Sequence, residues 1–534
     1  MPRTPEVKDQ TPFVSLIVPV LALDRESRGL TQLLESVRSQ SFADWEVLIV
    51  ATDAGDPRTE ISHGWEDRRI HVLLGSGANE FAGAVNMGLN GASGQFVGIV
   101  GENDRLSHEA LRTMSEALRR SANGDIVYSD VRRAGASQDF LKPDFSPERL
   151  RSQFYIGNLT LYRRSLLASI GGARGALDGA VLYDLALRAT EQARIVEHVR
   201  ATLYTEGKQA VEEQWGATTS SRLAATRQVL EEHLKRTGGG YVEQINASGN
   251  HVTHRLIEGE PLVSVIIPTR GSYAQVRGKD RCLVVEAVRS VIELTTYTNY
   301  EFVIVIDDVM PESVETQLRD IAGERVRFVV WTKPFSFSEK MNLGVLYARG
   351  DYLLFLNDDV EVVAPDWMTA MLALAQRPRA GLVGAMLYFE DETIQHAGHA
   401  YFKLDVTHIG LNSPRGAAGP SGAFLVEREV AGVTCACAML PKHVFFEAGG
   451  FSPLLPGNFN DVDLCMKATG LGYQCYWTPY AELYHFESKT RDPRVSTYEI
   501  NVAWGRWEHL FYDSPLWPTD PHEIYGRSSE DWPR

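Results

Sequence analysis

The chain has 534 residues, of which 44% are hydrophobic and 23% charged, and its formal net charge is −16. This length exceeds one ordinary domain, and the composition is typical of soluble proteins with apolar cores, so we expect two or three domains. The acidic balance argues against a nucleic-acid-binding protein with a basic face, because phosphate contacts need clustered lysine and arginine side chains.

The chain shows no signal for membrane insertion or export. No apolar run reaches the ~18–20 residues of a membrane-spanning helix. Residues 1–12 (MPRTPEVKDQTP) lack the apolar core of a signal peptide. We therefore expect a cytoplasmic protein, and peripheral association with the inner face of the cell membrane stays open.

The cysteines are few and odd in number, which does not suit a disulfide framework. They are Cys282, Cys435, Cys437, Cys465 and Cys475. Their spacing matches no zinc ribbon or zinc finger, so we interpret them as small buried side chains in preference to metal ligands.

The elements predicted along the chain occur twice in the same order. Residues 14–20 (VSLIVPV) and 263–269 (VSVIIPT) are short apolar runs that stop near a proline, which is typical of buried strands. Each run is followed by a helical pattern and two further strands. These elements lie at residues 30–40, 44–55 and 70–74 in the first copy and at residues 282–294, 299–310 and 326–330 in the second. The alternation predicts βαβ units and a mostly parallel sheet in each copy.

The fourth strand carries the difference between the copies. Residues 86–106 (NMGLNGASGQFVGIVGENDRL) align without a gap on residues 342–362 (NLGVLYARGDYLLFLNDDVEV). The motif Asn-Asp-Asp at residues 357–359 therefore faces Gly-Glu-Asn at residues 101–103. A shift of one residue would instead bring the carboxylate of Asp104 to the last position of the motif.

Two further segments complete the expected organisation. Residues 209–258 predict a helical connector, because apolar residues recur at helical spacing up to a stop at residues 238–240 (GGG). Residues 491–534 are rich in Trp, Tyr and Pro, and we expect them to pack on the second domain as a tail. The first domain is then expected at residues 12–208 and the second at residues 259–490.

Ligands of open parallel sheets bind beyond the carboxyl ends of the strands. In the second copy the polar residues at these ends are Thr269, Arg270, Asp307, Asp308 and residues 357–359. Carboxylates brought together repel one another unless a cation lies between them. The convergence of acidic groups therefore indicates a binding site with a cation rather than ordinary packing.

These motifs resemble those of family-2 glycosyltransferases of the GT-A fold. The second copy has VSVIIPT, VIDD, LNDDVEV, FNDVDLC and YHFES in the order of that family, and the first has VSLIVPV, VYSD, LKPDFSPERL and YDLALR. The arrangement is similar to that of tandem-domain enzymes of bacterial O-antigen and surface polysaccharide synthesis. The resemblance implies two GT-A-like α/β domains, with mostly parallel sheets flanked by helices.

The resemblance also implies a reaction. An inverting hexosyltransferase of this kind moves a sugar from a nucleotide-diphosphate sugar to a hydroxyl of a glycan or lipid-linked acceptor. It needs a divalent cation, Mg²⁺ or Mn²⁺, on the leaving diphosphate. It also needs a base for the acceptor proton and two substrates held in line. The donor sugar, the nucleotide, the acceptor and the oligomeric state stay open, because pocket shape decides them and not the fold.

The metal site implied by the resemblance lies in the acidic motif of the second copy. Asp359 should bind the cation, and Asp358 should bind the ribose or reach the cation through water. Asn357 keeps an oxygen ligand where the family commonly has Asp. His485, after the strand that ends in AELYH, matches a histidine that completes the metal site in part of the family. The alternatives are a solvated acidic turn and a structural histidine.

The nucleotide-sugar site implied by the resemblance has more members. They are Pro268, Thr269, Arg270, Asp307, Asp308, Lys340, Asn342, Asn357 and Asp358. Asp307 and Asp308 match a pair that contacts the base and ribose, although an Asp pair can also open a turn or cap a helix. Lys340 and Asn342 would face the diphosphate, the alternative for Lys340 being a solvated lysine.

The passage PLLPGNFNDVDLC predicts a loop and then the start of a helix. Asn460 can cap this helix, and Asp461 and Asp463 fall in the first turn, where the helix dipole favours anions. Asp461 matches the catalytic base of the family, and the alternative is an ordinary first-turn acid. Asp463 is expected to support the loop or the fold, and it is also assigned to the acceptor side. In TIQHAGHAYF, His396 and His399 are also expected on the acceptor side.

The first copy serves as an internal control. It has Thr52 for Asp307, Ala84 for Lys340, Asn103 for Asp359, Leu182 for Asp461 and Thr205 for His485. Pro19, Asn86, Gly94 and the apolar strands persist, which indicates loss of catalysis with retention of the fold. We therefore expect an inactive first domain, with a second active site of altered chemistry as the alternative.

Two other functions compete with sugar transfer. A scaffold with two inactive domains would explain why Asn357 and Asn460 stand where carboxylates are common. A nucleotidyltransferase would need a glycine-rich, basic triphosphate loop after the first strand, and PTRGSYAQVRGKDR is not spaced like such a loop.

Overall fold

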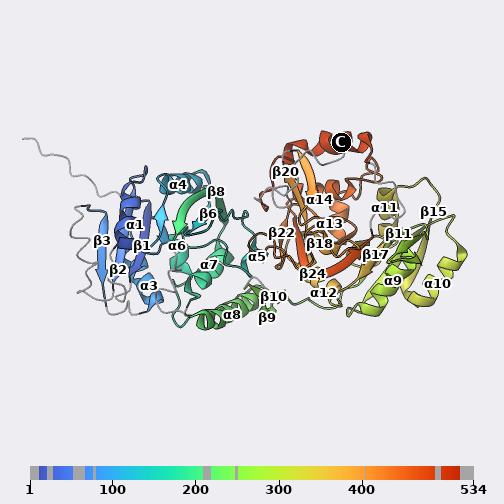
Figure 1. Ribbon diagram of the computed structural model, residues 1–534, viewed down its shortest axis with the longest axis horizontal. Helices are drawn as coiled ribbons and strands as arrows, with labels where there is room; N and C mark the ends of the chain where they lie inside the picture. The colour runs from blue at the N-terminus through green and yellow to red at the C-terminus, as the bar shows by residue number, and fades with distance from the viewer. Residues whose placement is uncertain are drawn as a thin grey trace, which may run out of the picture. The chain divides into compact units, whose positions relative to one another are not determined.

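The structure is a computed structural model. It describes residues 11–20, 28–51, 67–75, 80–177, 179–207, 218–246, 250–402, 404–486 and 495–517. The chain divides into two compact units, and each unit is made of two separate segments of the sequence. The first unit is Met1–Phe145 with Gln153–Thr237, and the second is Ser146–Ser152 with Gly238–Arg534. Figure 1 colours both units by residue number.

The first unit is built on one eight-stranded sheet. Its strands, in spatial order, are β3 (Ile70–Leu74), β2 (Trp45–Ala51), β1 (Val14–Val20), β4 (Phe96–Ile99), β7 (Thr160–Arg163), β6 (Gly124–Arg133), β8 (Ile195–Glu206) and β5 (Arg105–Leu106). The first four strands run parallel, and β7 and β5 are antiparallel to their neighbours. The helices are α1 (Arg28–Arg38), α3 (Phe81–Gly91), α4 (Ala110–Arg120), α6 (Arg164–Ser169), α7 (Val181–Gln192) and α8 (Thr219–Arg236).

The second unit repeats this strand order. The equivalent strands are β15 (Val326–Trp331), β14 (Tyr300–Asp307), β11 (Val263–Thr269), β16 (Tyr352–Leu356), β23 (Cys437–Pro441), β18 (Ala380–Tyr388), β24 (Gln474–His485) and β17 (Val360–Val362). Two short strands extend the sheet, β19 (Ile394–His396) beside β18 and β22 (Arg428–Val430) beside β24. The prediction of two mostly parallel α/β sheets in tandem is confirmed.

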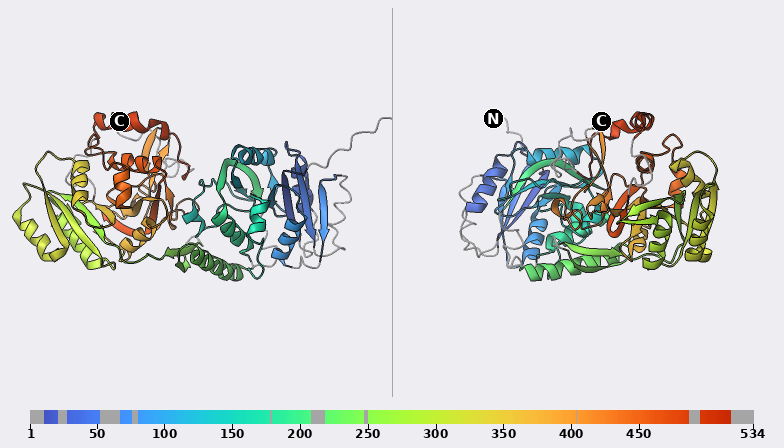
Figure 2. Two further views of the ribbon diagram at one scale, coloured as in Figure 1. Left: turned by 180° about the vertical axis from the view of Figure 1, so that it is seen from behind. Right: turned by 45° about the vertical axis from the view of Figure 1, so that its right-hand side comes forward.

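The remaining elements of the second unit are hairpins and helices. The hairpins are β9 (Gly240–Ile245) with β10 (His251–Arg255), β12 (Tyr273–Val276) with β13 (Lys279–Cys282), and β20 (His399–Phe402) with β21 (Asp405–His408). The helices are α5 (Pro147–Leu150), α9 (Leu283–Leu294), α10 (Glu312–Ala322), α11 (Phe337–Tyr347), α12 (Trp367–Ala375), α13 (Lys442–Glu447), α14 (Asn460–Gly470) and α15 (Thr497–Trp507). Short 3-10 turns lie at Gly323–Arg325, Pro420–Gly422 and Glu508–Leu510. Figure 2 shows the helices of each unit from two further sides.

Apolar side chains pack on both faces of the central strands. In β11, Val265 and Ile267 belong to one apolar cluster and Ile266 belongs to the other. Side chains of a strand point alternately to its two faces, so each face of the sheet has its own core. This explains the unbroken apolar runs that the sequence shows at the parallel strands. The five cysteines are buried and none is in a disulfide, as expected.

A glycine at the start of the fourth strand keeps the same contacts in both units. Gly94 donates its N–H to the Ser15 hydroxyl, and Gly350 donates to Ser264, each at 2.8 Å. A Cβ on Gly350 would lie 2.4 Å from the carbonyl oxygen of Leu262, and real side chains do not approach a backbone that closely. The persistence of this glycine in the first copy therefore reflects packing.

The predicted connector is divided between the two units. Helix α8 begins at a capping box of Thr218 and Ser221, and it packs on α7, where His233 lies 2.7 Å from Glu191. The hairpin of β9 and β10 belongs to the second unit. No helix in the described part of the chain combines the length and the apolarity needed to cross a bilayer.

Seven residues from the first half of the sequence, Ser146–Ser152, belong to the second unit. Arg151 is fully buried there; it contacts Glu427, donates to Glu148 at 2.5 Å and donates to the Thr253 carbonyl oxygen at 3.0 Å. Burial alone would raise the pKa of Glu148, but Arg151 and Arg255 hold that pKa well below its usual range. The second unit thus depends on a charge cluster that the first half of the chain completes.

Replacing Arg151 should destabilise the second unit. Arg151→Ala leaves buried carboxylates without their partner, which costs on the order of 3–5 kcal/mol in measured cases. We expect faster hydrogen exchange in β10 and β22 and a lower unfolding midpoint.

Arg227→Ala is the matched control, because Arg227 makes an exposed ion pair with Glu231 one helical turn away. Such pairs contribute about 0.5 kcal/mol or less. Equal effects of the two substitutions would contradict the role of the buried cluster.

Candidate functional site

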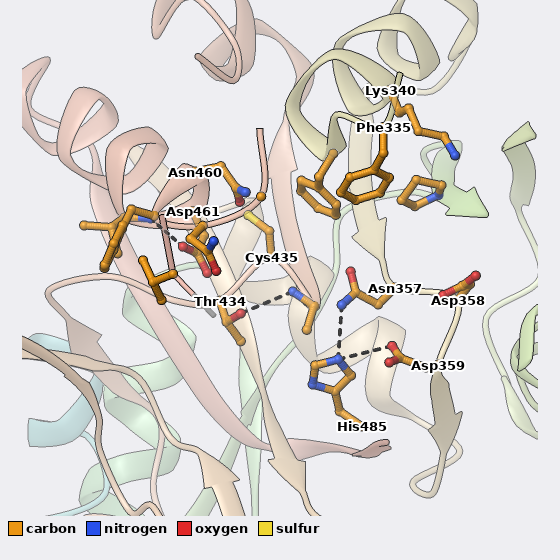
Figure 3. Close-up of a pocket in the computed structure, with 18 of the residues that line it drawn as sticks. Phe335, Lys340, Asn357, Asp358, Asp359, Thr434, Cys435, Asn460, Asp461 and His485 are labelled. Atoms are coloured by element: carbon orange, nitrogen blue, oxygen red, sulfur yellow. Dashed lines mark hydrogen bonds and ion pairs between the residues drawn. The ribbon is translucent and has the colours of Figure 1, made fainter. Parts of the chain in front are cut away.

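The second unit contains a cavity of about 550 Å³. Figure 3 shows its two walls, with Asn357, Asp359 and His485 on one side and Asn460 and Asp461 on the other. The residues that line it include Pro268, Thr269, Arg270, Asp307, Phe335, Phe337, Lys340, Asn357, Asp358, Asp359, His399, His408, Gly457, Asn458, Phe459, Asn460, Asp461 and His485. The cavity lies beyond the carboxyl ends of β11, β14 and β16, where the sheet rule predicts a ligand.

The acidic turn after β16 brings two carboxylates into a buried wall. The hydroxyl of Thr269 donates to Asp358 Oδ2 at 2.6 Å. Burial, and then the charge of Asp359, raise the pKa of Asp358 to about 7. A cation held between these groups would remove the cost of their charge.

His485 is oriented towards the same turn. Its Nδ1 lies 2.7 Å from Gln395 Oε1, and its Nε2 lies 3.2 Å from Asp359 Oδ1 and 3.1 Å from Asn357 Nδ2. Because Gln395 Oε1 is an acceptor, the ring proton belongs on Nδ1 and the Nε2 lone pair faces Asn357 and Asp359. Histidine ligands in metal sites are commonly oriented in this way by a hydrogen bond to the other nitrogen. The donor set fits a divalent cation.

Lys340 lies in the wall at the end of β11 and β14. Its ammonium donates to Asp307 Oδ1 at 2.7 Å and to the Thr269 carbonyl oxygen at 3.0 Å, and the residue is almost fully buried. Burial lowers the pKa of Lys340, while Asp307 favours the charged form. The alternative of a solvated lysine is therefore wrong.

Two predicted members of the nucleotide-sugar site do not line the cavity. Asn342 donates to the Phe451 carbonyl oxygen at 2.8 Å and accepts the Phe451 N–H at 2.9 Å. Both polar atoms of the Asn342 side chain are hydrogen-bonded to the backbone of Phe451, so the prediction that Asn342 faces a diphosphate is not supported. Asp308 is exposed at the turn after β14, next to Asp307.

The opposite wall is the start of helix α14. Asp461 lies in its first turn, accepts the N–H of Val462 at 2.8 Å and lines the cavity. Asp463 is buried and turned away, bound by Lys467, Arg506 and Trp507 at 2.8–3.0 Å. Its assignment to the acceptor side is therefore corrected, and its contacts favour the expected role in supporting the fold.

Three imidazoles converge beside this wall. His399 and His408 are register partners in β20 and β21, and the ring of His396 lies 5.1 and 4.7 Å from theirs. Nε2 of His396 accepts the Thr434 N–H at 3.2 Å, which places the ring proton on Nδ1. In that tautomer Nδ1 of His396 has no lone pair to offer a metal. His399 and His408 line the cavity and His396 does not, so the acceptor-side prediction is corrected for His396.

Sequence reasoning missed several residues around the cavity. Gln395 precedes His396 in the motif TIQHAGH, but no local pattern connects it to His485, ninety residues away. His408 carries no motif of its own and is found only through its pairing with His399. Phe335 lies just before the helix of Lys340 and Phe337 is its first residue, and an apolar residue at such a place usually belongs to a core.

The first unit has a different set of groups at the equivalent positions. The Ser107 N–H binds the Leu203 carbonyl oxygen, as the Val363 N–H binds that of Glu482. Asn103 precedes Ser107 by the same number of residues as Asp359 precedes Val363. Asn103 therefore takes the position of Asp359, as the gapless alignment predicts. Asp104 falls opposite Val360, and both are 2% exposed.

The same count corrects the counterpart of His485. It is Glu206, not Thr205. Asn158 Nδ2 donates to Glu206 Oε1 at 3.2 Å, and Arg133 lies 3.7 Å from Oε2. The first unit therefore has a carboxylate held by neighbouring side chains where the second has an imidazole.

Helix α7 confirms the comparison at the other wall. Arg188 binds Asp184 and the Gly172 carbonyl oxygen, as Lys467 binds Asp463 and the carbonyl oxygen of Gly450. Two residues earlier, Leu182 occupies the position of Asp461 and is buried. Thr52, the predicted counterpart of Asp307, lies outside the described residues.

The repeated sheet order and the acidic cavity at the strand ends define an α/β protein of the GT-A type. A family model described as "Glycosyl transferase family 2" matches residues 15–172 and 264–445. The chain belongs to glycosyltransferase family 2, with one match in each half of the sequence.

Two curated relatives match along most of the chain. "O-antigen biosynthesis protein RfbC" of Myxococcus xanthus is 32% identical over 500 residues, which cover 90% of this chain and 38% of the relative. "Uncharacterized protein y4gI" of Sinorhizobium fredii is 33% identical over 505 residues, which cover 90% of this chain and 54% of the relative. The chain thus spans about half the length of these relatives or less.

Solved structures match more weakly. S. aureus TarS 1-349 in complex with UDP-GlcNAc is 20% identical, with a TM-score of 0.35, and the match covers 42% of this chain and 72% of that chain. GalNAc-T7 with UDP, GalNAc and Mn²⁺ is 14% identical, with a TM-score of 0.38, and the match covers 51% and 53%. Likenesses of this size add nothing to what the site itself indicates.

The contacts of Asn342 predict a stability effect. Asn342→Ala removes two hydrogen bonds to Phe451 and should lower the free energy of unfolding by about 2 kcal/mol. Asn86 makes the same two contacts with Ala173 in the first unit, at 2.8 Å each. Asn86→Ala should therefore cost a similar amount in chemical denaturation. A difference above ~1 kcal/mol would contradict the equivalence of the two contacts.

Proposed function

We propose that the second unit is an inverting, metal-dependent glycosyltransferase that uses a nucleotide-diphosphate sugar. The observation that carries this proposal is one cavity with Asp359 and His485 on one wall and Asp461 on the facing wall (Figure 3). The first wall offers oxygen and nitrogen ligands for a cation, and the second offers a carboxylate for a proton. Membership of glycosyltransferase family 2 supports the reaction class.

Asp359 and His485 would hold the cation, Mg²⁺ or Mn²⁺. Asn357 would add its oxygen after its amide turns, since its Nδ2 faces His485 here. When bound, the cation neutralises the diphosphate that leaves the sugar. Thr269 fixes Asp358 by its hydroxyl, so that this carboxylate can face the ribose or a water on the cation. Lys340 adds positive charge at the end of β11 beside Asp307.

Asp461 would act as the base. It takes the proton of the acceptor hydroxyl, and the acceptor oxygen forms a bond to the anomeric carbon. The bond from that carbon to the diphosphate oxygen breaks on the opposite face, and the nucleoside diphosphate leaves. Asp461 lies in the first turn of α14, where the helix N-terminus carries partial positive charge.

We propose that the first unit does not catalyse transfer. Asn103, Leu182 and Ala84 stand at the positions of the metal carboxylate, the base and the lysine, while the backbone-binding residues are kept. A role in structure or acceptor binding is consistent with this pattern. The competing function is a scaffold with no active unit, which Asn357 and Asn460 favour because each stands where the family commonly has a carboxylate.

The pathway and acceptor are part of the proposal. The name of the Myxococcus relative concerns O-antigen biosynthesis. We therefore propose a glycan or lipid-linked acceptor in surface polysaccharide synthesis, reached by a protein that acts at the inner face of the cell membrane. A thermal-shift screen of nucleotide-diphosphate sugars with Mn²⁺ would identify the donor, and no shift with any donor would favour the scaffold.

Removal of the proposed base tests the chemistry. Asp461→Asn should reduce kcat at least ~100-fold, in the range usual for a lost general base, with little change in donor KM. Steady-state transfer with the donor from the screen measures both constants. Asp320→Asn, on the exposed face of α10, is the control and should leave both unchanged. Full activity of Asp461→Asn would exclude this residue as the base.

Removal of the cation ligands tests the metal site. Mn²⁺ binding, followed by electron paramagnetic resonance, should be lost in Asp359→Ala. Gln395→Leu should weaken it about 10–100-fold, because the hydrogen bond that orients His485 disappears. Asn103→Ala in the first unit should have no effect. Mn²⁺ binding that is indifferent to Asp359 would place the cation elsewhere.

A further inference from the structure

Helix α14, which carries the proposed base, has no side-chain cap at its N-terminus. Phe459 stands at the N-cap of α14 with a φ of 55°, a left-handed conformation that residues with a side chain rarely adopt. Its side chain makes no capping hydrogen bond. Gly457 and Asn458, which precede it, line the cavity. The position of Asp461, two residues further on, therefore needs support from another element.

Helix α15 supplies that support through Glu499. Oε1 of Glu499 accepts the N–H groups of Gly457 and Asn458 at 2.8 and 2.7 Å, and Oε2 accepts from Asn458 Nδ2 at 3.0 Å. The residue is 4% exposed. Burial alone would raise its pKa, but these hydrogen bonds hold the pKa of Glu499 below its usual range. One carboxylate thus fixes two consecutive peptide units of the loop.

The same helix is anchored to both sides of the loop. Ser496 caps α15 by accepting the Glu499 N–H at 3.2 Å. The Trp504 ring meets Phe459 edge-on at 5.3 Å. Arg506 and Trp507 reach Asp463 on α14. Helix α15 therefore holds the loop before Asp461 and the helix turn after it.

We infer that Glu499 is a positioning residue for the base, acting through the Gly457–Asn458 backbone. This inference rests on the proposed function of Asp461. Glu499 is not among the residues that line the cavity, and none of the contacts above touches the wall of Asp359 and His485. Its removal should therefore affect the base and not the donor.

Glu499→Ala should lower kcat about 10–100-fold and leave donor KM within twofold. Glu499→Gln should restore most of the activity, because its amide oxygen can still accept both backbone N–H groups and Asn458 can turn its own amide to match. Glu508→Gln, an exposed carboxylate just after α15, is the control and should match the wild type. A merely structural role would lower donor affinity and kcat together.

Hydrogen exchange at residues 457–462 gives a readout that needs no turnover. Exchange should be faster in Glu499→Ala than in the wild type and unchanged in Glu508→Gln. If the wild type transfers no sugar from any donor, the proposed function fails. Hydrogen exchange at residues 457–462 still tests whether Glu499 fixes the loop. Unchanged exchange, or a normal kcat in Glu499→Ala, would overturn the inference.

Discussion

Repulsion between Asp358 and Asp359 is the constraint on which the site depends. Two neighbouring carboxylates at the end of a buried strand are costly unless something positive or hydrogen-bonded compensates them. The hydroxyl of Thr269 supplies part of that compensation by donating to Asp358, and a cation would supply the rest. The donor set at this edge of the sheet fits a divalent ion. The acidic motif can form such a site only because the strand order brings the ends of β11, β16 and β24 to the same edge of the sheet.

The two units separate the contacts that hold the fold from the groups that could do chemistry. Asn86 and Asn342 bind backbone in the same way, and Gly94 and Gly350 both donate to a serine hydroxyl. At the strand ends the side chains differ. Loss of a group at a strand end removes no core contact, so one copy can change there while its sheet stays intact.

Much of this could be predicted from the sequence. The strands are continuous apolar runs, and their repetition gives the domain count and the edge where Asp307, Asp358 and Asp359 meet. The register at Asn103 was also predictable, because residues 86–106 and 342–362 have equal length. The counterpart of His485 was also within reach of the sequence, because Glu206 follows Asp184 at the same spacing at which His485 follows Asp463.

The directions of side chains were a feature that the sequence could not predict. Asn342 and Asp463 sit in motifs beside the site, yet both point to backbone or to other helices. The motif cannot show this, since neighbouring residues of a helix face different ways. The contacts of Glu499 could not be predicted from the sequence for a different reason. Its partners lie about forty residues earlier in the chain, and a first-turn glutamate after a serine resembles an ordinary helix start.

The crossing of Ser146–Ser152 into the second unit has a consequence for how such a protein can be inherited. A gene broken between the two units would place Arg151 and Glu427 in separate polypeptides, and each product would carry half of a buried charge cluster. Recombination that exchanges one unit for a distant homologue meets the same barrier. The two halves repeat one fold, yet the second unit includes a segment from the first half of the sequence.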